Sequence, residues 1–262
     1  MRKAVGICVG VLALVFGAVN QASAVLLLNE VMNNVPGGAD NGHEFIEISG
    51  SASESVANVW ILWVDADSGG DTGFGRVLNA TDLTSAGTVG TNGFLLVRDS
   101  ATVLNPAPAG ATTVLVVDFN PDWDNDTGTF LLVTNFTGTA GIGTGTDLDT
   151  DDNGSAETVS SFGVVLDSLT ITDSSGGDQS YADDFGGTTL PQQIAPAYSP
   201  DLAFRSTQTS QWEFGDGLGA NPGPYTLDPA NVSNAGFAGA TISPGNDNSN
   251  TLDVEVSETS VE

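Results

Sequence analysis

The chain has 262 residues and a formal net charge of −28 at pH 7, because 33 aspartates and glutamates face only five lysines and arginines. This balance argues against binding to nucleic acids and to anionic membranes, since both interactions require a basic surface that releases counterions. Hydrophobic residues make up 40% of the sequence, which argues against an acidic chain that stays disordered along most of its length.

Residues 1–24 have the pattern of a secretory signal peptide. A basic start precedes an unbroken apolar run over residues 4–19, and the small residues ASA (22–24) follow. The apolar run is short for a membrane span, so we predict cleavage after Ala24, with a retained N-terminal anchor as the alternative. The mature protein is then a secreted bacterial protein, in the extracellular space or on the cell surface, with no membrane span. Its only cysteine, Cys8, is lost with the leader, so no disulfide stabilises it.

Short apolar runs of strand length recur along the chain, separated by clusters of Gly, Asp, Asn and Thr. They lie at residues 25–32, 44–50, 56–66, 93–99, 112–119, 128–136 and 163–172. Only residues 81–86 suggest a short helical turn. From residue 174 onwards the pattern weakens to loops and short edge strands, because Pro191, Pro196 and Pro200 would interrupt a central strand. Many strands without interleaved helices predict an all-β fold, an antiparallel sandwich or barrel.

The chain length is compatible with one elaborated β domain. We place this domain at residues 25–242. Residues 243–262 are polar and acidic with little to bury, so we expect a disordered tail, although TLDVEV (251–256) could form an edge strand.

The order of the segments resembles the lamin tail domain. LLLNEVM (26–32) and EFIEI (44–48), joined by a Gly- and Pro-rich loop, are similar to the first two strands of that family. The later matches are GFLLVRD (93–99), TFLLVTNFTG (129–138), DLDTDDNG (147–154), VVLDSLTI (164–171), QWEFGDG (211–217) and NPGPYT (221–226). The resemblance extends over residues 26–225. It implies a single immunoglobulin-like β-sandwich with long acidic loops and a non-enzymatic role, often beside nucleases, proteases or cell-surface modules.

The loop DLDTDDNGSAE (147–157) has the spacing of a calcium-binding loop. Aspartate or asparagine occupies alternate positions and Gly154 follows, which fits the pattern D-x-[DN]-x-[DN]-G. Ca²⁺ takes roughly six to eight hard oxygen ligands, and alternate side chains of a tight loop converge on one point. The usual bidentate glutamate at the twelfth position is absent, and a solvated acidic turn is the alternative. The predicted ligands are Asp147, Asp149, Asp151, Asn153, Ser155 and Glu157.

Two other acidic clusters have a similar spacing but weaker patterns. The first contains Asp122, Asp124 and Asp126, and the second contains Asp65, Asp67 and Asp71. Each could add a metal site, but hairpin turns rich in Asp and Gly have the same composition.

Residues for catalysis are scarce. His43 is the only histidine, the mature chain has no cysteine or lysine, and the nucleophile motif G-x-S-x-G does not occur. A catalytic triad or a zinc site therefore lacks its usual side chains. Glu44 and Glu47 lie three residues apart on one predicted strand, hence on opposite faces, which makes them a poor glycosidase pair. We expect His43 and Glu44 to be polar residues at a strand edge.

One tryptophan is a candidate for stacking against a sugar ring. Trp123 lies within the acidic segment 122–126, which makes it the best exposed candidate of the four tryptophans. Packing in the core or at its rim is nevertheless favoured over this role for all four tryptophans.

These observations predict a non-catalytic structural or interaction module at the bacterial cell exterior, stabilised by Ca²⁺. Its partner would be an extracellular protein or a surface polysaccharide. The first alternative is a calcium-dependent carbohydrate-binding protein, which an exposed aromatic side chain near the acidic loops would favour and a buried Trp123 would not. The second is an extracellular hydrolase, which requires a concave pocket where two or more acids converge with a raised pKa.

Overall fold

The computed structural model describes residues 25–36, 42–68, 74–102, 104–123, 125–157, 160–173, 176–191, 199–220, 223–246 and 248. Within these residues the chain forms 12 strands in two sheets, with only short 3₁₀ helices between them. The prediction of an all-β sandwich is confirmed. None of the described helices is long and apolar enough to cross a membrane. The predicted leader (1–24) and residues 249–262 of the predicted tail lie outside the described residues.

The first sheet has seven strands in the order β12-β11-β10-β1-β2-β5-β6. They are β1 (Leu27–Met32), β2 (Phe45–Ser49), β5 (Phe94–Asp99), β6 (Thr113–Val117), β10 (Leu202–Arg205), β11 (Trp212–Leu218) and β12 (Thr226–Val232). All neighbours are antiparallel except β5 and β6, which run parallel. The expectation of only loops and edge strands after residue 174 is wrong for β10 and β11, which lie inside this sheet.

The second sheet has five strands in the order β4-β3-β7-β8-β9. They are β3 (Val59–Asp65), β4 (Val77–Asp82), β7 (Gly128–Thr134), β8 (Val164–Ile171) and β9 (Thr188–Leu190). The 3₁₀ helices are η1 (Thr84–Ala86), η2 (Ser160–Phe162), η3 (Asp183–Phe185) and η4 (Ala235–Phe237). Since β8 and β9 also run parallel, the predicted antiparallel pairing holds for all but two of the strand pairs.

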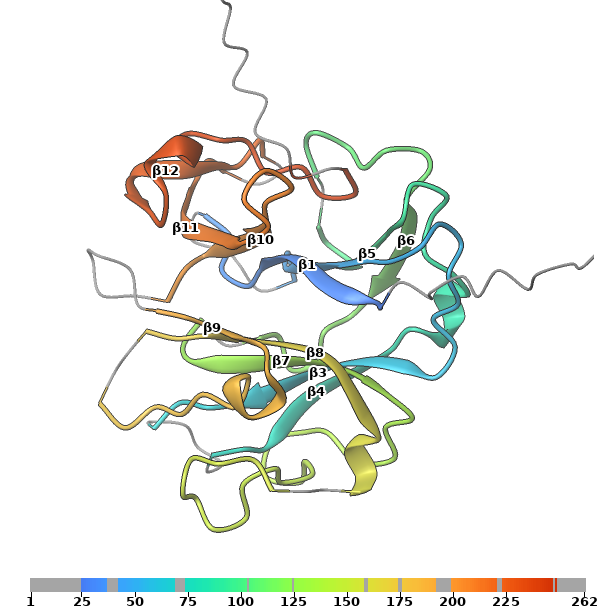
Figure 1. The fold of residues 1–262 in the computed structure, drawn as a ribbon, viewed down its shortest axis with the longest axis vertical. Helices are drawn as coiled ribbons and strands as arrows, with labels where there is room; N and C mark the ends of the chain where they lie inside the picture. Colours follow the sequence, from blue (N-terminus) through green and yellow to red (C-terminus); the bar gives the residue numbers. More distant parts are fainter. Residues whose placement is uncertain are drawn as a thin grey trace, which may run out of the picture.

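The two sheets stack as layers, with the larger sheet in the upper half of Figure 1 and the smaller sheet below it. In the inner strands, alternate residues enter different clusters, as the period of two in a strand requires. On β3, Ile61 and Trp63 pack in the core between the sheets, whereas Leu62 and Val64 pack on the outer face of the smaller sheet. The outer face of the larger sheet also carries an apolar cluster, around Phe45. Burial on both faces explains why many strands are nearly continuous apolar runs.

Hydrogen bonds among Asp167, Leu28 and Arg205, referred to as the polar clamp, join the two sheets. Asp167 on β8 accepts hydrogen bonds from the backbone amide of Leu28 on β1, at 2.9 Å, and from the guanidinium of Arg205 on β10, at 2.8 Å. The Nε of Arg205 also donates to the carbonyl oxygen of Leu28, at 2.8 Å. Because Asp167 is mostly buried, the clamp fixes how the two layers sit against each other where β1 crosses β8.

Candidate metal centre

The predicted calcium loop is organised around the buried carboxylate of Asp149, which is 0% exposed. Its Oδ1 accepts a hydrogen bond from the backbone amide of Asn153, at 3.0 Å. Its Oδ2 accepts hydrogen bonds from the amide of Gly154, at 2.7 Å, and from the hydroxyl of Tyr181, at 3.0 Å. Burial and this bond to Asp149 raise the pKa of Tyr181. The carboxylate therefore stabilises the turn through N–H and O–H donors of the protein.

Two of the other predicted ligands of this loop, Asp147 and Glu157, also have partners within the protein. Asp147 forms an ion pair with Arg76, at 2.9 Å, and Glu157 accepts hydrogen bonds from the backbone and side chain of Thr150. The side chains of Asp151, Asn153 and Ser155 are exposed. No three carboxylates of the fully described loop 147–157 bring ligand atoms within 4.8 Å of one another. Calcium binding by this loop stays a prediction.

Three acidic side chains do converge at the end of the larger sheet. One carboxylate oxygen each of Glu44, Asp99 and Asp122 lies within 4.8 Å of the other two. Carboxylate oxygens at such separations are the ligand type that Ca²⁺ and Mg²⁺ prefer. We refer to Glu44, Asp99 and Asp122 as the acidic triad.

Strand pairing explains how the acidic triad assembles. Glu44 precedes β2 and Asp99 ends β5, and these antiparallel strands place them together, since the amide of Asp99 donates to the carbonyl oxygen of Glu44, at 3.0 Å. β6 runs parallel to β5, with Val117 paired to Asp99. The segment after β6, which carries Asp122, therefore begins at the same edge of the sheet. No local spacing in the sequence reveals such a triad.

The acidic triad is an electrostatically strained arrangement. Glu44 is 1% exposed, and its Oε2 accepts hydrogen bonds from the amides of Gly42, at 3.0 Å, and His43, at 2.9 Å. Its burial, together with the negative charges of Asp122 and Asp99, raises the pKa of Glu44 from 4.5 to about 7. A bound cation would relieve both the burial penalty and the repulsion.

The buried Asp99 of the acidic triad is held in place by three hydrogen bonds. Its Oδ1 accepts hydrogen bonds from the hydroxyl of Ser100, at 3.1 Å, and the amide of Ala101, at 3.3 Å, while its Oδ2 accepts one from the amide of Phe119, at 3.0 Å. Donors of this kind orient a carboxylate and leave lone pairs for a metal ion.

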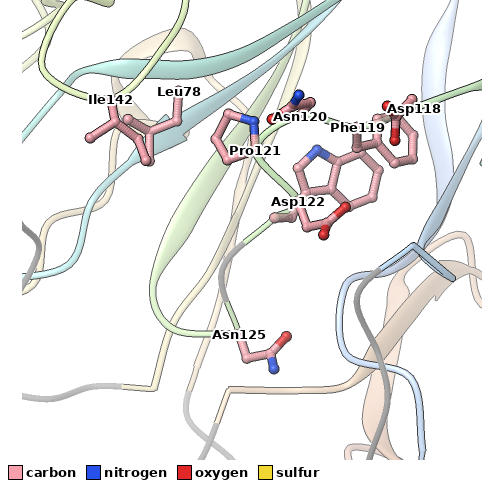
Figure 2. Close-up of a pocket in the computed structure, with 9 residues that line it drawn as sticks. Leu78, Asp118, Phe119, Asn120, Pro121, Asp122, Asn125 and Ile142 are labelled. Carbon is pink, nitrogen blue, oxygen red and sulfur yellow. The ribbon is translucent and has the colours of Figure 1, made fainter.

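A cavity of about 480 Å³ lies beside the acidic triad, and Figure 2 shows the residues that line it. Asp122 belongs both to the acidic triad and to this wall. The other lining residues are Leu78, Asp118, Phe119, Asn120, Pro121, Trp123, Asn125 and Ile142. The polar side chains come mainly from the loop between β6 and β7, so a cation held by Asp122 would lie at the border between the protein interior and an accessible cavity.

The weaker predicted clusters are only partly brought together. Asp122 lies with Glu44 and Asp99, which are not among the predicted ligands, rather than with Asp126. Asp65 is buried and accepts a hydrogen bond from the amide of Asp67, at 3.1 Å, as in an ordinary turn. Asp71 and Asp124 lie outside the described residues.

Trp123, the candidate for sugar stacking, is buried, with only 3% of the residue exposed. Its ring packs against Phe119, with a centroid separation of 4.1 Å, and against Phe130, at 4.8 Å. These contacts in the apolar core cover the face of the indole that would stack on a sugar ring.

The raised pKa of Glu44 predicts a pH-dependent stability in calcium-free buffer. The folded protein holds this proton up to a pH of about 7, whereas the unfolded chain releases it near pH 4.5. The free energy of unfolding should therefore fall as the pH rises between these values. Allowing for solvent screening, we expect Glu44→Gln to be more stable than wild type by about 2 kcal/mol at pH 8. The variants should be similar at pH 4.5. Urea unfolding of both proteins across this range checks the difference, and a constant difference would contradict it.

No protein-family model, curated protein or solved structure matches the chain significantly. The resemblance to the lamin tail domain therefore rests on the sequence motifs alone.

Proposed function

We propose that the chain is a secreted, non-catalytic module of the bacterial cell exterior, with a lamin-tail-like, immunoglobulin-like sandwich that Ca²⁺ stabilises. The ion would bind to the acidic triad, and the module would interact with an extracellular protein or a surface polysaccharide. The convergence of Glu44, Asp99 and Asp122 around one point carries this proposal. It supplies hard oxygen ligands at a place where the protein itself leaves negative charge concentrated.

The ligand chemistry favours calcium over a transition metal. The sequence has one histidine, and its single cysteine is Cys8, whereas zinc and copper sites draw on imidazole and thiolate ligands. The 33 acidic residues of the chain repel one another at low ionic strength. A divalent cation at the end of the sheet would reduce this repulsion and join β2, β5 and the segment after β6.

Thermal melting with calcium and with EGTA tests the proposal. At a calcium concentration of about 1,000 times Kd, binding adds about 4 kcal/mol to the free energy of unfolding, which raises Tm by about 10 °C in a protein of this size. We expect Glu44→Gln and Asp122→Asn to lose most of this increase.

Asp151→Asn is the matched control, because it removes one negative charge from an exposed residue of the predicted calcium loop. It should retain the increase. Loss of the increase in Asp151→Asn alone would assign the ion to the loop, and an unchanged Tm in wild type at low salt would contradict structural calcium altogether.

The hydrolase alternative receives less support from the geometry. The acids of the triad converge, and the pKa of Glu44 is raised to about 7. However, Glu44 is buried and does not line the adjacent cavity, so it lacks access to a substrate bound there. A general acid must reach the atom that it protonates, and we therefore propose a non-enzymatic role.

The second candidate is calcium-dependent binding of a polysaccharide in the cavity. Asp122 lies in both the acidic triad and the cavity wall, so hydroxyl groups of a ligand could complete the coordination of an ion held there. With Trp123 buried, the amides of Asn120 and Asn125 would replace aromatic stacking. Titration with soluble bacterial polysaccharides should give binding that EGTA abolishes and that Asn120→Ala weakens about tenfold. Binding that is equally strong in EGTA would contradict this candidate.

A further inference from the structure

A second pair of acids is buried on the outer face of the larger sheet. Glu30 on β1 and Glu47 on β2 stand directly opposite each other in the strand register, and both are 0% exposed. They lie on the face opposite to Ile46 and Ile48, which enter the core between the sheets. Two carboxylates in this position are unusual, because a like-charged pair directly across two strands is destabilising even at the surface.

The two carboxylates differ in their partners. Glu47 accepts hydrogen bonds from the side-chain amide of Asn29 and from the backbone amide of Gly245. Neither carboxylate oxygen of Glu30 has a hydrogen-bond partner. The Nδ2 of Asn248 also lacks one, although this side chain and the backbone of Ser243 lie near Glu30 and partly offset the rise in its pKa. A buried carboxylate without hydrogen bonds is strongly unfavourable unless something else satisfies it.

The negative charge of Glu30 and Glu47 is not neutralised by a basic side chain of the described residues. Beyond residue 24 the sequence contains three arginines and no lysine. Arg76 pairs with Asp147, Arg98 donates to the carbonyl oxygens of Asp99 and Thr102, and Arg205 pairs with Asp167. Burial and the charge of Glu47 raise the pKa of Glu30, and no basic group counters them.

A segment near the C-terminus covers the pair Glu30 and Glu47. Residues 243–246 and Asn248 belong to the predicted tail, but they lie against this sheet. The carbonyl oxygen of Gly245 accepts hydrogen bonds from the side chains of Asn92, at 3.2 Å, and Thr112, while its amide donates to Glu47. The glutamate pair is thus enclosed between the sheet and this segment.

We infer that Glu30 and Glu47 form an internal binding site for a hard cation, Ca²⁺, which residues 243–246 and Asn248 cover. The unpartnered oxygens of Glu30 would bind the ion directly. Glu47 would contribute its remaining lone pairs while Asn29 and Gly245 orient it, as outer-shell donors orient the ligands of metal sites. A proton on Glu30 would remove its charge, but the remaining carbonyl oxygen of the side chain would still lack a hydrogen-bond donor.

This site is separate from the acidic triad. Glu44 immediately precedes β2 and Glu47 lies three residues further along the extended chain, which corresponds to about 10 Å, and the two side chains lie on opposite faces of the sheet. The inference therefore stands or fails independently of the proposed function. Its consequence is that calcium would fix the C-terminal segment on the sheet through Gly245 and Asn248.

Native mass spectrometry of the protein with excess CaCl₂ counts the bound ions, and comparison of variants assigns them to sites. We expect Glu30→Gln to bind one Ca²⁺ fewer than wild type, and Glu47→Gln to do the same. Both substitutions remove a buried charge without changing side-chain volume. Glu44→Gln should retain the ion at Glu30. An unchanged count in Glu30→Gln would overturn this inference, whereas an unchanged count in Glu44→Gln would count against the acidic triad.

Hydrogen exchange of wild type gives a second readout that does not depend on the folding of a variant. Calcium should slow the exchange of the Gly245 amide at least tenfold relative to EGTA, because the ion holds Glu47 and its donor in place. Equal protection of Gly245 in calcium and in EGTA would overturn the inference.

Discussion

Replacement of Asp149 by alanine should lower the free energy of unfolding by about 4 kcal/mol. The substitution removes the common acceptor of three donors, the amides of Asn153 and Gly154 and the hydroxyl of Tyr181. Hydrogen bonds to a charged group contribute about 1.5–3 kcal/mol each, and buried donors left without an acceptor add a desolvation penalty. Urea unfolding of the variant and of wild type measures the loss.

Two further variants separate the contributions to this loop. Tyr181→Phe removes a single donor and should lose about 1 kcal/mol. Asp149→Asn keeps one acceptor oxygen but places an amide NH₂ against other donors, so we expect an intermediate loss. If hydrogen bonds alone organise the loop, Asp149→Ala loses the same free energy in calcium and in EGTA. A loss confined to calcium would instead support the predicted metal site at residues 147–157.

Strand alternation was the part of the fold that local sequence could predict. In EFIEI the alternation separates Ile46 and Ile48 from Phe45 and Glu47, and the structure places the two groups on opposite faces of β2. The pattern carried this information because a strand has a period of two regardless of its partners. It could not show that the outer face is also covered, which is why Glu47 is buried rather than solvated.

Strand pairing was the part that local sequence could not predict. β11 reads WEFGDGL and is rich in residues typical of turns, yet it lies between β10 and β12. The acidic triad depends on the same long-range pairing, since Glu44, Asp99 and Asp122 come from segments separated by dozens of residues. The spacing at residues 147–154 was a strong local signal, but hydrogen bonds within the loop satisfy the same pattern. The local motif therefore predicted a metal site in the loop 147–157, whereas the pairing of the strands brings acidic side chains together in the acidic triad.

Replacement of Gly128 by alanine should lower the free energy of unfolding by about 3 kcal/mol. A Cβ atom at this position of β7 would lie 1.8 Å from the Cη2 atom of Trp63. Trp63 is fully buried and packs against Phe130, with a centroid separation of 4.6 Å, so its ring has no room to withdraw. Overpacking of this kind costs about 1–3 kcal/mol and occasionally more. We expect the upper end of this range because β7 is the central strand of the smaller sheet.

Gly110→Ala is the matched control, because its Cβ would meet no atom within 4 Å. We expect this control to stay within about 0.5 kcal/mol of wild type. A second substitution, Trp63→Phe, should restore part of the stability of Gly128→Ala by removing the atoms that clash, which a double-mutant cycle measures. Gly128→Ala with wild-type stability would show that the indole has space to move.

The same clash should reach the acidic triad through a row of aromatic rings. Trp63 contacts Phe130, Phe130 contacts Trp123 at a centroid separation of 4.8 Å, and Trp123 follows Asp122 directly in the chain. Because close-packed cores transmit strain, displacement of Trp63 shifts the segment that carries Asp122. Gly128→Ala should therefore also reduce the rise in Tm that calcium produces, whereas Gly110→Ala should leave it unchanged. A full calcium response in Gly128→Ala would show that Asp122 is positioned independently of the core.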